Sequence, residues 1–192
     1  MAKIRPKKLG RAFYRRGAEQ VAPDLIGKIL VHRIGGQRLR ARIVETEAYV
    51  GCHDLACHAS KGRTRRTEVM FGPPGHAYVY FIYGMYEMLN FVCAPKGNAQ
   101  AVLIRAAEPL DGWETDLSGP GKLAREMKIR RSDNGVDLTG EELFVMEDGN
   151  SHRRVIPGKR IGVDYAKEWK DQLLRFCDAD SPAVSRPRPA AP

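Results

Sequence analysis

Two carboxylates and a phenol recur at every second position of the segment 43–49, which reads IVETEAY. Side chains alternate between the two faces of a strand, so Glu45, Glu47 and Tyr49 would share one face if the strand is regular. A carboxylate beside an aromatic wall can act as a general base that deprotonates water. A solvent-exposed face with one ion-paired glutamate would give the same pattern. The spacing alone does not choose between Glu45 and Glu47.

A run of tyrosines is the second feature that could do chemistry. Four of the seven tyrosines lie within nine residues, in the segment 78–86, which reads YVYFIYGMY. Aromatic faces stack on nucleic-acid bases, and cationic side chains bind phosphates. The run therefore indicates contact with unpaired or extruded bases, although a strand of core aromatics would have the same composition.

The distribution of charge favours nucleic acid as the partner. The formal net charge of the 192-residue chain is +9, and residues 1–40 contain eleven Lys and Arg against Glu19 and Asp24. Basic clusters recur at 61–66 (KGRTRR) and at 122–131 (KLAREMKIRR). Uncompensated positive charge attracts polyanions, although any single cluster could be a solvated face.

Metal and nucleotide motifs are weak in this sequence. Cys52, His53, Cys57 and His58 are residue types that bind zinc, but their spacing is not that of a standard zinc finger and no second paired cluster completes them. The segment 119–122 (GPGK) could hold a phosphate at the start of a helix, yet it lacks the longer glycine pattern of a P-loop. We therefore expect no metal and no cofactor.

The order of predicted elements is that of an α+β protein with a mainly antiparallel sheet. Gly35-Gly36 and Gly84-Met85 are turn signals between apolar segments, and the second turn puts Tyr83 at a hairpin tip. Strands are predicted at 28–33, 37–49, 77–83, 86–94, 101–107, 143–147, 160–163 and 173–176, and helices at 64–71 and 117–130.

The chain is predicted to form a single domain over residues 1–184, with a basic N-terminal segment at 1–20. Residues 185–192 are Pro-rich and are predicted to be disordered. No apolar stretch has the length of a membrane span, and the basic N-terminus lacks the apolar core of a signal peptide. A cytoplasmic protein is the resulting expectation.

Ordered motifs across roughly residues 8–184 closely resemble the 3-methyladenine DNA glycosylases of the alkyladenine/methylpurine family. They are IVETEAY (43–49), His58, MFGPPG (70–75), YVYFIYGMYEMLN (78–90), LIRAAEPL (103–110), SGPGKLA (118–124), RIGV (160–163) and LLRF (173–176). The resemblance implies one mixed domain built around a curved, mainly antiparallel sheet flanked by helices.

The resemblance also implies roles for particular residues. Glu47 matches the catalytic general base, and Tyr83 matches the side chain that fills the gap left by an extruded nucleotide. The base pocket would be formed by Tyr49, His58, Tyr80 and Asn90. Contacts with the nucleotide or the DNA are expected from Arg105, Lys61 and Arg63.

The activity implied by the resemblance is base excision repair. The enzyme would flip alkylated or deaminated purines out of duplex DNA and hydrolyse the N-glycosidic bond with a Glu47-activated water, leaving an abasic site. No lysine lies in the matched pocket segments, so a monofunctional enzyme without lyase activity is expected. The expected partner is double-stranded DNA with damaged purines, bound by a monomer that is nucleoid-associated if the source is bacterial. A non-enzymatic nucleic-acid-binding protein is the competing hypothesis.

Overall fold

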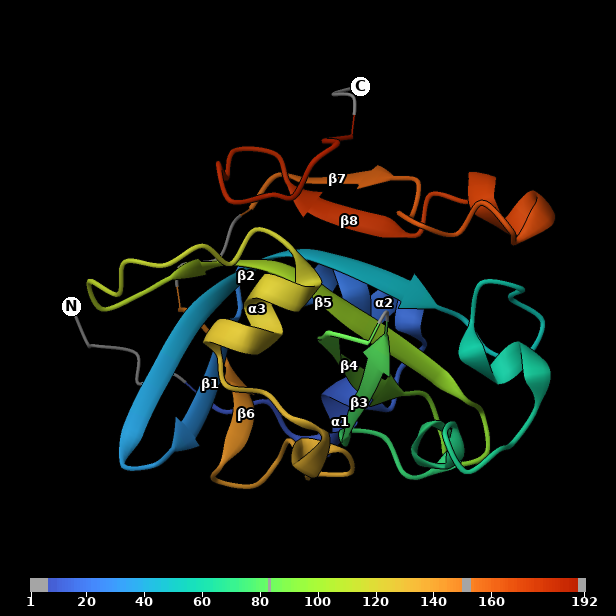
Figure 1. Ribbon diagram of the computed structural model, residues 1–192, viewed down its shortest axis with the longest axis horizontal. Coiled ribbons are helices and arrows are strands. Elements are labelled where there is room, and N and C mark those ends of the chain that lie inside the picture. The colour runs from blue at the N-terminus through green and yellow to red at the C-terminus, as the bar shows by residue number, and fades with distance from the viewer. Residues whose placement is uncertain (1–6, 83, 150–152, 190–192) are drawn as a thin grey trace.

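The computed structural model describes residues 7–82, 84–149 and 153–189 (Figure 1). In these residues, eight strands form one sheet in which every pair is antiparallel, with the path β3-β4-β5-β2-β1-β6 and with β8 joining β2 to β7. The strands are β1 (Ile29–Ile34), β2 (Gln37–Tyr49), β3 (Ala77–Ile82), β4 (Tyr86–Cys93), β5 (Gln100–Pro109), β6 (Leu143–Met146), β7 (Val155–Gly158) and β8 (Arg175–Asp178). The sheet curls, and the predicted α+β class with a curved antiparallel sheet is confirmed.

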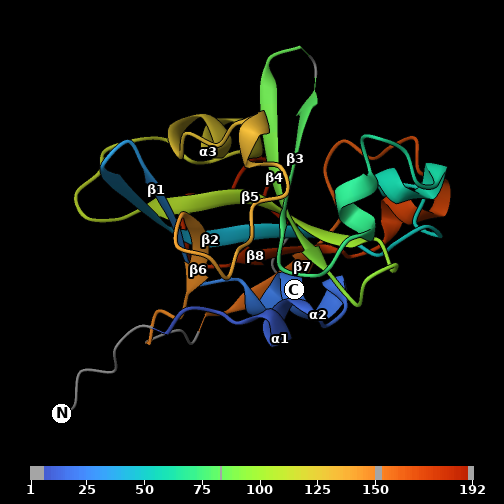
Figure 2. The same ribbon diagram turned by 90° about the horizontal axis from the view of Figure 1, so that it is seen from below.

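Two predicted hairpins are confirmed. Gly35 and Gly36 have φ of +56° and +74°, the left-handed conformation that a tight two-residue turn between β1 and β2 requires. β3 and β4 pair up to Ile82 and Tyr86, and this hairpin projects from the body of the molecule (Figure 2). Tyr83, the residue predicted at its tip, lies outside the described residues.

The long strand β2 organises the middle of the sheet. One edge of β2 pairs with β5 over most of its length, while its other edge pairs first with β1 and then with β8. The β2–β5 register shifts twice near Glu45, so that Val44 in β2 and Arg105 in β5 have no direct partner across the ladder. Such bulges re-aim side chains, and here the bulge governs where Arg105 points.

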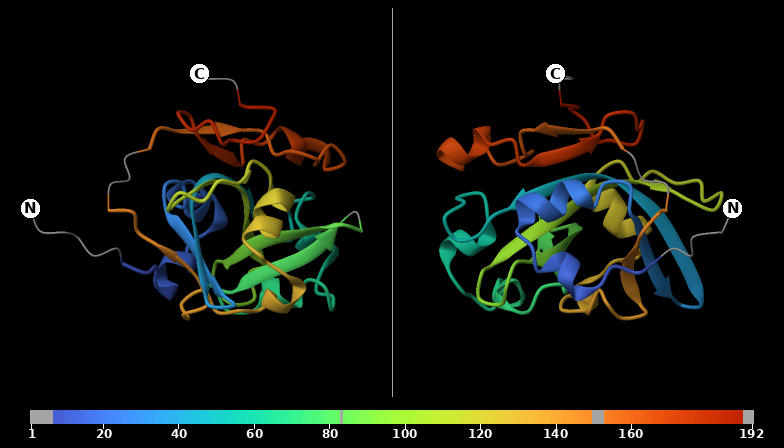
Figure 3. Two further views of the ribbon diagram at one scale, coloured as in Figure 1. Left: turned by 60° about the vertical axis from the view of Figure 1, so that its left-hand side comes forward. Right: turned by 180° about the vertical axis from the view of Figure 1, so that it is seen from behind.

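Helices cover both sides of the curled sheet. α3 (Pro120–Glu126) packs on β4 and β5, whereas α1 (Arg11–Tyr14) and α2 (Ala18–Asp24) lie on the opposite side (Figures 2 and 3). Fully buried Tyr14, Leu25, Ile43, Ile104 and Leu123 belong to the main hydrophobic core. None of the described helices has the length and apolar character needed to cross a bilayer.

Several predicted elements differ from the structure. The helix predicted at 117–130 is only α3, and it stops before Lys128, whose φ of +57° is left-handed. The helix predicted at 64–71 is reduced to the 3₁₀ turn η2 (Glu68–Phe71). No strand forms at 160–163. The strand in this part of the chain is β7, which begins five residues before the predicted start. The strand predicted at 173–176 begins two residues later, as β8.

Candidate active site

A cavity of about 280 Å³ opens between the β3–β4 hairpin, the end of β2 and the loop after β7. Aromatic and apolar side chains predominate in its wall, with a few polar groups among them. It is lined by Tyr49, Ala56, Cys57, His58, Met70, Tyr78, Tyr80, Ile82, Met88, Asn90, Ala101, Leu103, Arg105, Pro120, Ile161, Gly162, Val163 and Tyr165. Such a concave, mostly apolar site with a few convergent polar groups is typical of ligand binding.

Glu47 lies directly behind this wall with no exposed surface. Its Oε2 accepts a hydrogen bond from the Tyr49 hydroxyl at 2.9 Å, and its Oε1 accepts one from the Ile161 N–H at 2.8 Å. Arg105 Nη1 lies 3.4 Å from the same Oε1. All three donors belong to cavity-lining residues. The carboxylate is therefore fixed in orientation by groups that face the cavity.

Tyr49 is held as a neutral phenol. Burial is the main cause that raises the pKa of Tyr49 well above the usual value, and the charge of Glu47 adds to it. The hydroxyl therefore remains a donor to Glu47 over the whole physiological pH range.

Glu45 has a different set of contacts. Oε1 accepts from Arg105 Nε at 2.8 Å and from Arg175 Nε at 2.7 Å, and Oε2 accepts from the Ser185 N–H at 2.7 Å. The Ser185 hydroxyl adds a fourth bond of 2.9 Å to Oε1. Glu45 does not line the cavity and is saturated with donors, as expected of a structural anion. Ser185, which the sequence assigns to the tail, is buried here.

Arg105 connects the two carboxylates. Its guanidinium pairs with Glu45 through Nε and with Glu47 through Nη1, and the residue is only 7% exposed. The resemblance implies a contact with the flipped nucleotide for this arginine. In the structure Arg105 lines the cavity from a buried position, and all three of its guanidinium nitrogens have a partner, because Nη2 also donates to the Ser185 hydroxyl at 3.5 Å.

The predicted pocket aromatics lie together on the opposite wall. His58 begins the 3₁₀ turn η1 (His58–Lys61), and its Nδ1 shares a hydrogen bond of 3.0 Å with the Tyr78 hydroxyl. Its ring centroid is 4.5 Å from that of Tyr80 in an edge-on arrangement. Burial, helped by Arg66 and Lys61, lowers the pKa of His58 to about 4. The imidazole is therefore neutral at pH 7. Tyr78, which the resemblance does not place among the pocket residues, is also a lining residue.

Asn90 of β4 completes the set of predicted pocket residues. Its Nδ2 donates to the carbonyl of Tyr78 at 3.2 Å and to that of Met88 at 3.3 Å. These two bonds fix the amide at the cavity wall, where it can discriminate between ligands by hydrogen bonding.

The predicted DNA-contact residues Lys61 and Arg63 lie outside the cavity on exposed surface. Arg63 pairs with Glu68 at 2.5 Å. Sequence reasoning left the other arginines of this loop unassigned, and Arg66 lies 5.2 Å above the Tyr80 ring. A surface depression lined by Arg65, Arg66 and Arg131 adjoins this side of the hairpin.

Sequence reasoning missed the buried pair of Arg160 and Asp54. The two side chains form two bonds of 2.5 and 2.9 Å, and Arg160 also donates to the Ala48 carbonyl. The guanidinium lies 4.8 Å above the Tyr49 ring. Arg160 thereby anchors the loop that directs the Ile161 N–H at Glu47. The RIGV motif was the available signal, but it was assigned to a strand.

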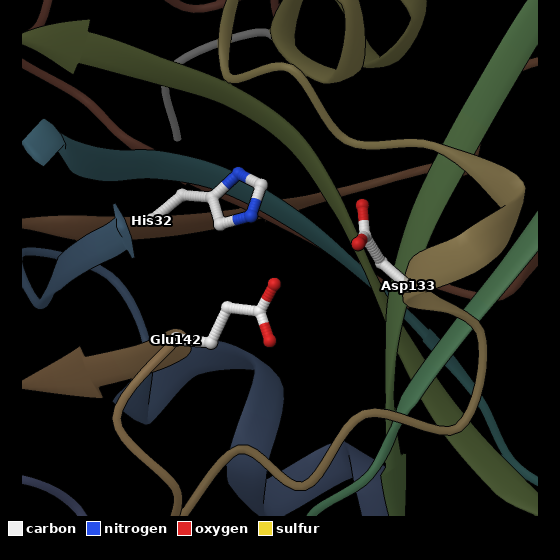
Figure 4. Close-up of side chains that lie close together, drawn as sticks. All are labelled: His32, Asp133 and Glu142. Carbon is white, nitrogen blue, oxygen red and sulfur yellow. The ribbon is translucent and has the colours of Figure 1, made fainter. Parts of the chain in front are cut away.

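The zinc hypothesis for Cys52, His53, Cys57 and His58 gains no support. Cys52 is exposed, whereas Cys57 is buried and its burial raises the thiol pKa to about 11. Within the described ranges, the side chains close enough to share a metal ion are instead His32, Asp133 and Glu142, none of which lines the cavity (Figure 4).

Comparison with known proteins agrees with the geometry. Residues 12–182 match the family model described as methylpurine-DNA glycosylase (MPG). A protein of Legionella pneumophila (strain Lens) is 50% identical over 94% of this chain and 99% of its own length. One from Anaeromyxobacter dehalogenans (strain 2CP-1) is 51% identical over 96% of this chain and 88% of its own. Both are named "Putative 3-methyladenine DNA glycosylase".

The fold, the site and these relatives define a DNA glycosylase, a hydrolase that acts on N-glycosyl bonds. The chain belongs to the methylpurine-DNA glycosylase family. The resemblance carried by the ordered motifs is thereby confirmed, and the substrate of the enzyme is DNA.

Proposed function

We propose that this enzyme excises alkylated or deaminated purines, 3-methyladenine among them, from duplex DNA with a water activated by Glu47. The observation that carries the proposal is the Glu47 carboxylate, held by Tyr49, Ile161 and Arg105 immediately behind an aromatic cavity. The names of the relatives support the substrate class.

The cavity suits one extruded base. Its volume of about 280 Å³ is at the small end of the range for ligand pockets. Tyr49, Tyr80 and the neutral His58 offer electron-rich rings, which favour a cationic alkylated purine over a neutral one. Extrusion costs least for a damaged or mispaired base, which adds to the selectivity.

Glu47 would deprotonate the attacking water and stabilise the positive charge that develops on the sugar. Because Glu47 has no exposed surface, water reaches its carboxylate only after one of the three donors moves. We expect binding of the base to displace one of these donors, so that water reaches the general base only when substrate is present. No lysine lines the cavity in the described part of the chain, so a monofunctional hydrolase is proposed.

Contacts outside the cavity would position the duplex. Tyr83, beyond the described residues, is proposed as the wedge, since Ile82 and Tyr86 flank it on the projecting hairpin. Lys61, Arg63 and the depression containing Arg66 offer positive charge for phosphates on the same side. Binding should therefore weaken steeply as salt increases.

The decisive experiment is single-turnover excision from a duplex that contains one alkylated or deaminated purine. Glu47→Gln should lower the excision rate by about 10²–10⁴-fold, the usual contribution of a general base, while binding to the lesion duplex is retained. The matched control is Glu19→Gln, which removes an exposed carboxylate outside the cavity and should excise at the wild-type rate. Excision by Glu47→Gln at the wild-type rate would refute the assignment.

Two further measurements separate the remaining parts of the proposal. Tyr83→Ala should slow excision of a paired lesion more than excision from a single strand, and equal losses would argue against a wedge. Release of the free base by the wild-type enzyme excludes a protein that only binds DNA. Borohydride should trap no covalent DNA adduct, and a trapped adduct would contradict a monofunctional mechanism.

A further inference from the structure

A second group of chemically reactive side chains lies outside the cavity. His32 is on β1, Asp133 ends the 3₁₀ turn η3 (Arg131–Asp133), and Glu142 precedes β6 (Figure 4). One ligand atom from each of the three lies within 4.8 Å of the others. The three side chains point toward one another, although His32 lies far from Asp133 and Glu142 in the sequence.

His32 has the hydrogen bonding of a metal ligand. Its Nδ1 lies 2.7 Å from the Met127 carbonyl, and a carbonyl only accepts, so Nδ1 carries the proton. In the neutral ring Nε2 is then an unprotonated acceptor. That atom is fully buried and has no hydrogen-bond partner among the residues that the structure describes, which is rare for a buried polar group. Metal-bound histidines usually donate their second N–H to a carbonyl or carboxylate in this manner.

Asp133 and Glu142 differ from most acidic residues of the described structure in their surroundings. No ion pair to Asp133 or Glu142 occurs within the described residues, whereas the adjacent Glu141 pairs with both Lys8 and Arg33. Asp133 is buried, and in the described part of the chain its Oδ2 accepts a hydrogen bond from the neutral Arg130 N–H at 2.7 Å. Two carboxylates without a basic partner repel one another, and a bound cation would offset that repulsion.

We propose that His32, Asp133 and Glu142 bind one divalent transition-metal ion of the Zn²⁺ type. His32 Nε2 and one oxygen from each carboxylate would supply three ligands. The imidazole nitrogen favours Zn²⁺ or Co²⁺ over Mg²⁺ and Ca²⁺, which prefer all-oxygen sites. Glu142 is exposed, so the ion enters from solvent on that side and water completes its coordination.

The site is structural, because none of its residues lines the cavity. An ion there would tie β1 and β6 to the turn that carries Asp133. The next residue, Asn134, accepts the N–H of Val79 in β3 through its side-chain oxygen at 3.0 Å. The metal would therefore brace the strand that contributes Tyr80 to the cavity, and its binding should raise the thermal unfolding midpoint.

The test is direct metal binding by the full chain after treatment with a chelator. All variants carry Cys52→Ser, because Cys52 is the exposed thiol and would bind Zn²⁺ on its own. Calorimetric titration with Zn²⁺ should give one ion per chain, and Co²⁺ should give a visible spectrum without thiolate charge-transfer bands. Glu142→Gln and Asp133→Asn should each weaken binding by about tenfold or more. The matched control, Glu141→Gln, should bind as the parent does.

The outcomes are distinct. Glu142 is exposed and makes no ion pair in the described structure, so Glu142→Gln should retain the fold even if Asp133→Asn does not. The proposal is overturned if the parent binds no stoichiometric Zn²⁺ at about 100 μM free metal. It is also overturned if Glu142→Gln binds Zn²⁺ with unchanged affinity.

Discussion

Replacing His58 with glutamine should remove a defined part of the acid sensitivity of this enzyme. Burial lowers the pKa of His58 to about 4 in the folded chain, against an ordinary value of 6.5 in the unfolded chain. Glutamine remains neutral, and it can still share a hydrogen bond with the Tyr78 hydroxyl, which His58 contacts at 3.0 Å. The variant therefore removes the group that titrates while it keeps most of the packing around position 58.

The direction in which stability changes with pH depends on whether the folded or the unfolded chain binds the proton more readily. Above pH 6.5 both states are neutral and His58 contributes no pH dependence. Between pH 6.5 and pH 4 the unfolded chain takes up a proton that the folded chain refuses, so stability falls as the pH falls. Each unit of pKa difference corresponds to about 1.36 kcal/mol, which gives about 3 kcal/mol as an upper bound for the total loss. Below pH 4 both states are protonated and the loss levels off.

Urea unfolding at a series of pH values between 7.5 and 4 measures this effect, with the fluorescence of Trp113 and Trp169 as the signal. The difference in unfolding free energy between wild type and His58→Gln should change by as much as 3 kcal/mol across this range. Titration of the other groups cancels in that difference. His53→Gln is the matched control, because it makes the same substitution at an exposed histidine outside the cavity.

Parallel pH profiles for wild type and His58→Gln would refute the reasoning, since they would mean that His58 titrates alike in both states. A wild-type enzyme that becomes more stable on acidification relative to the variant would refute it more strongly. In that case His58 would be protonated in the folded enzyme, and the cavity would not contain a neutral imidazole at pH 7.

Three other changes have expected outcomes. Glu45→Gln removes the anion between two buried arginines and should cost about 3–5 kcal/mol of unfolding free energy in urea, whereas exposed Glu19→Gln should cost less than about 0.5 kcal/mol. A thiol reagent should label one cysteine per native chain, and Cys52→Ser should abolish that labelling, because the other three cysteines are buried. Gly75→Ala should destabilise the fold by about 1–3 kcal/mol in the same urea assay, since φ is +77° and the new Cβ would lie 3.0 Å from the Tyr14 ring.

The parts of the fold that the sequence predicts well are those set by local chemistry. Alternating apolar residues on either side of Gly35-Gly36 and Gly84-Met85 specify the two hairpins, and the structure contains both. The strand predicted at 160–163 is wrong for a physical reason. There the Arg160 side chain and the Ile161 N–H are used by Asp54 and Glu47, so this segment is held by side chains rather than by a strand ladder.

The distinction between Glu45 and Glu47 lies beyond sequence patterning. It depends on the register shift that leaves Arg105 unpaired in β5, and on Ser185, which approaches Glu45 from the far end of the chain. Neither a bulge nor a contact over 140 residues leaves a periodic signal. The family resemblance implies that Glu47 is the base, whereas the contacts with Arg105, Arg175 and Ser185 indicate a structural role for Glu45.

The hydrogen bonds that Ser185 donates to Glu45 have a consequence for synthesis of the protein on the ribosome. Glu45 emerges 140 residues before the Ser185 N–H that it binds. At translation rates of about 5–20 residues per second, that interval is on the order of ten seconds. Once β4 has been synthesised, the nascent chain has β1, β2 and the β3–β4 hairpin, but it still lacks Ile161, Arg175 and Ser185, which complete the contacts of Glu45 and Glu47. The general base is therefore assembled among the last features of the molecule, after the segments expected to hold DNA are already available.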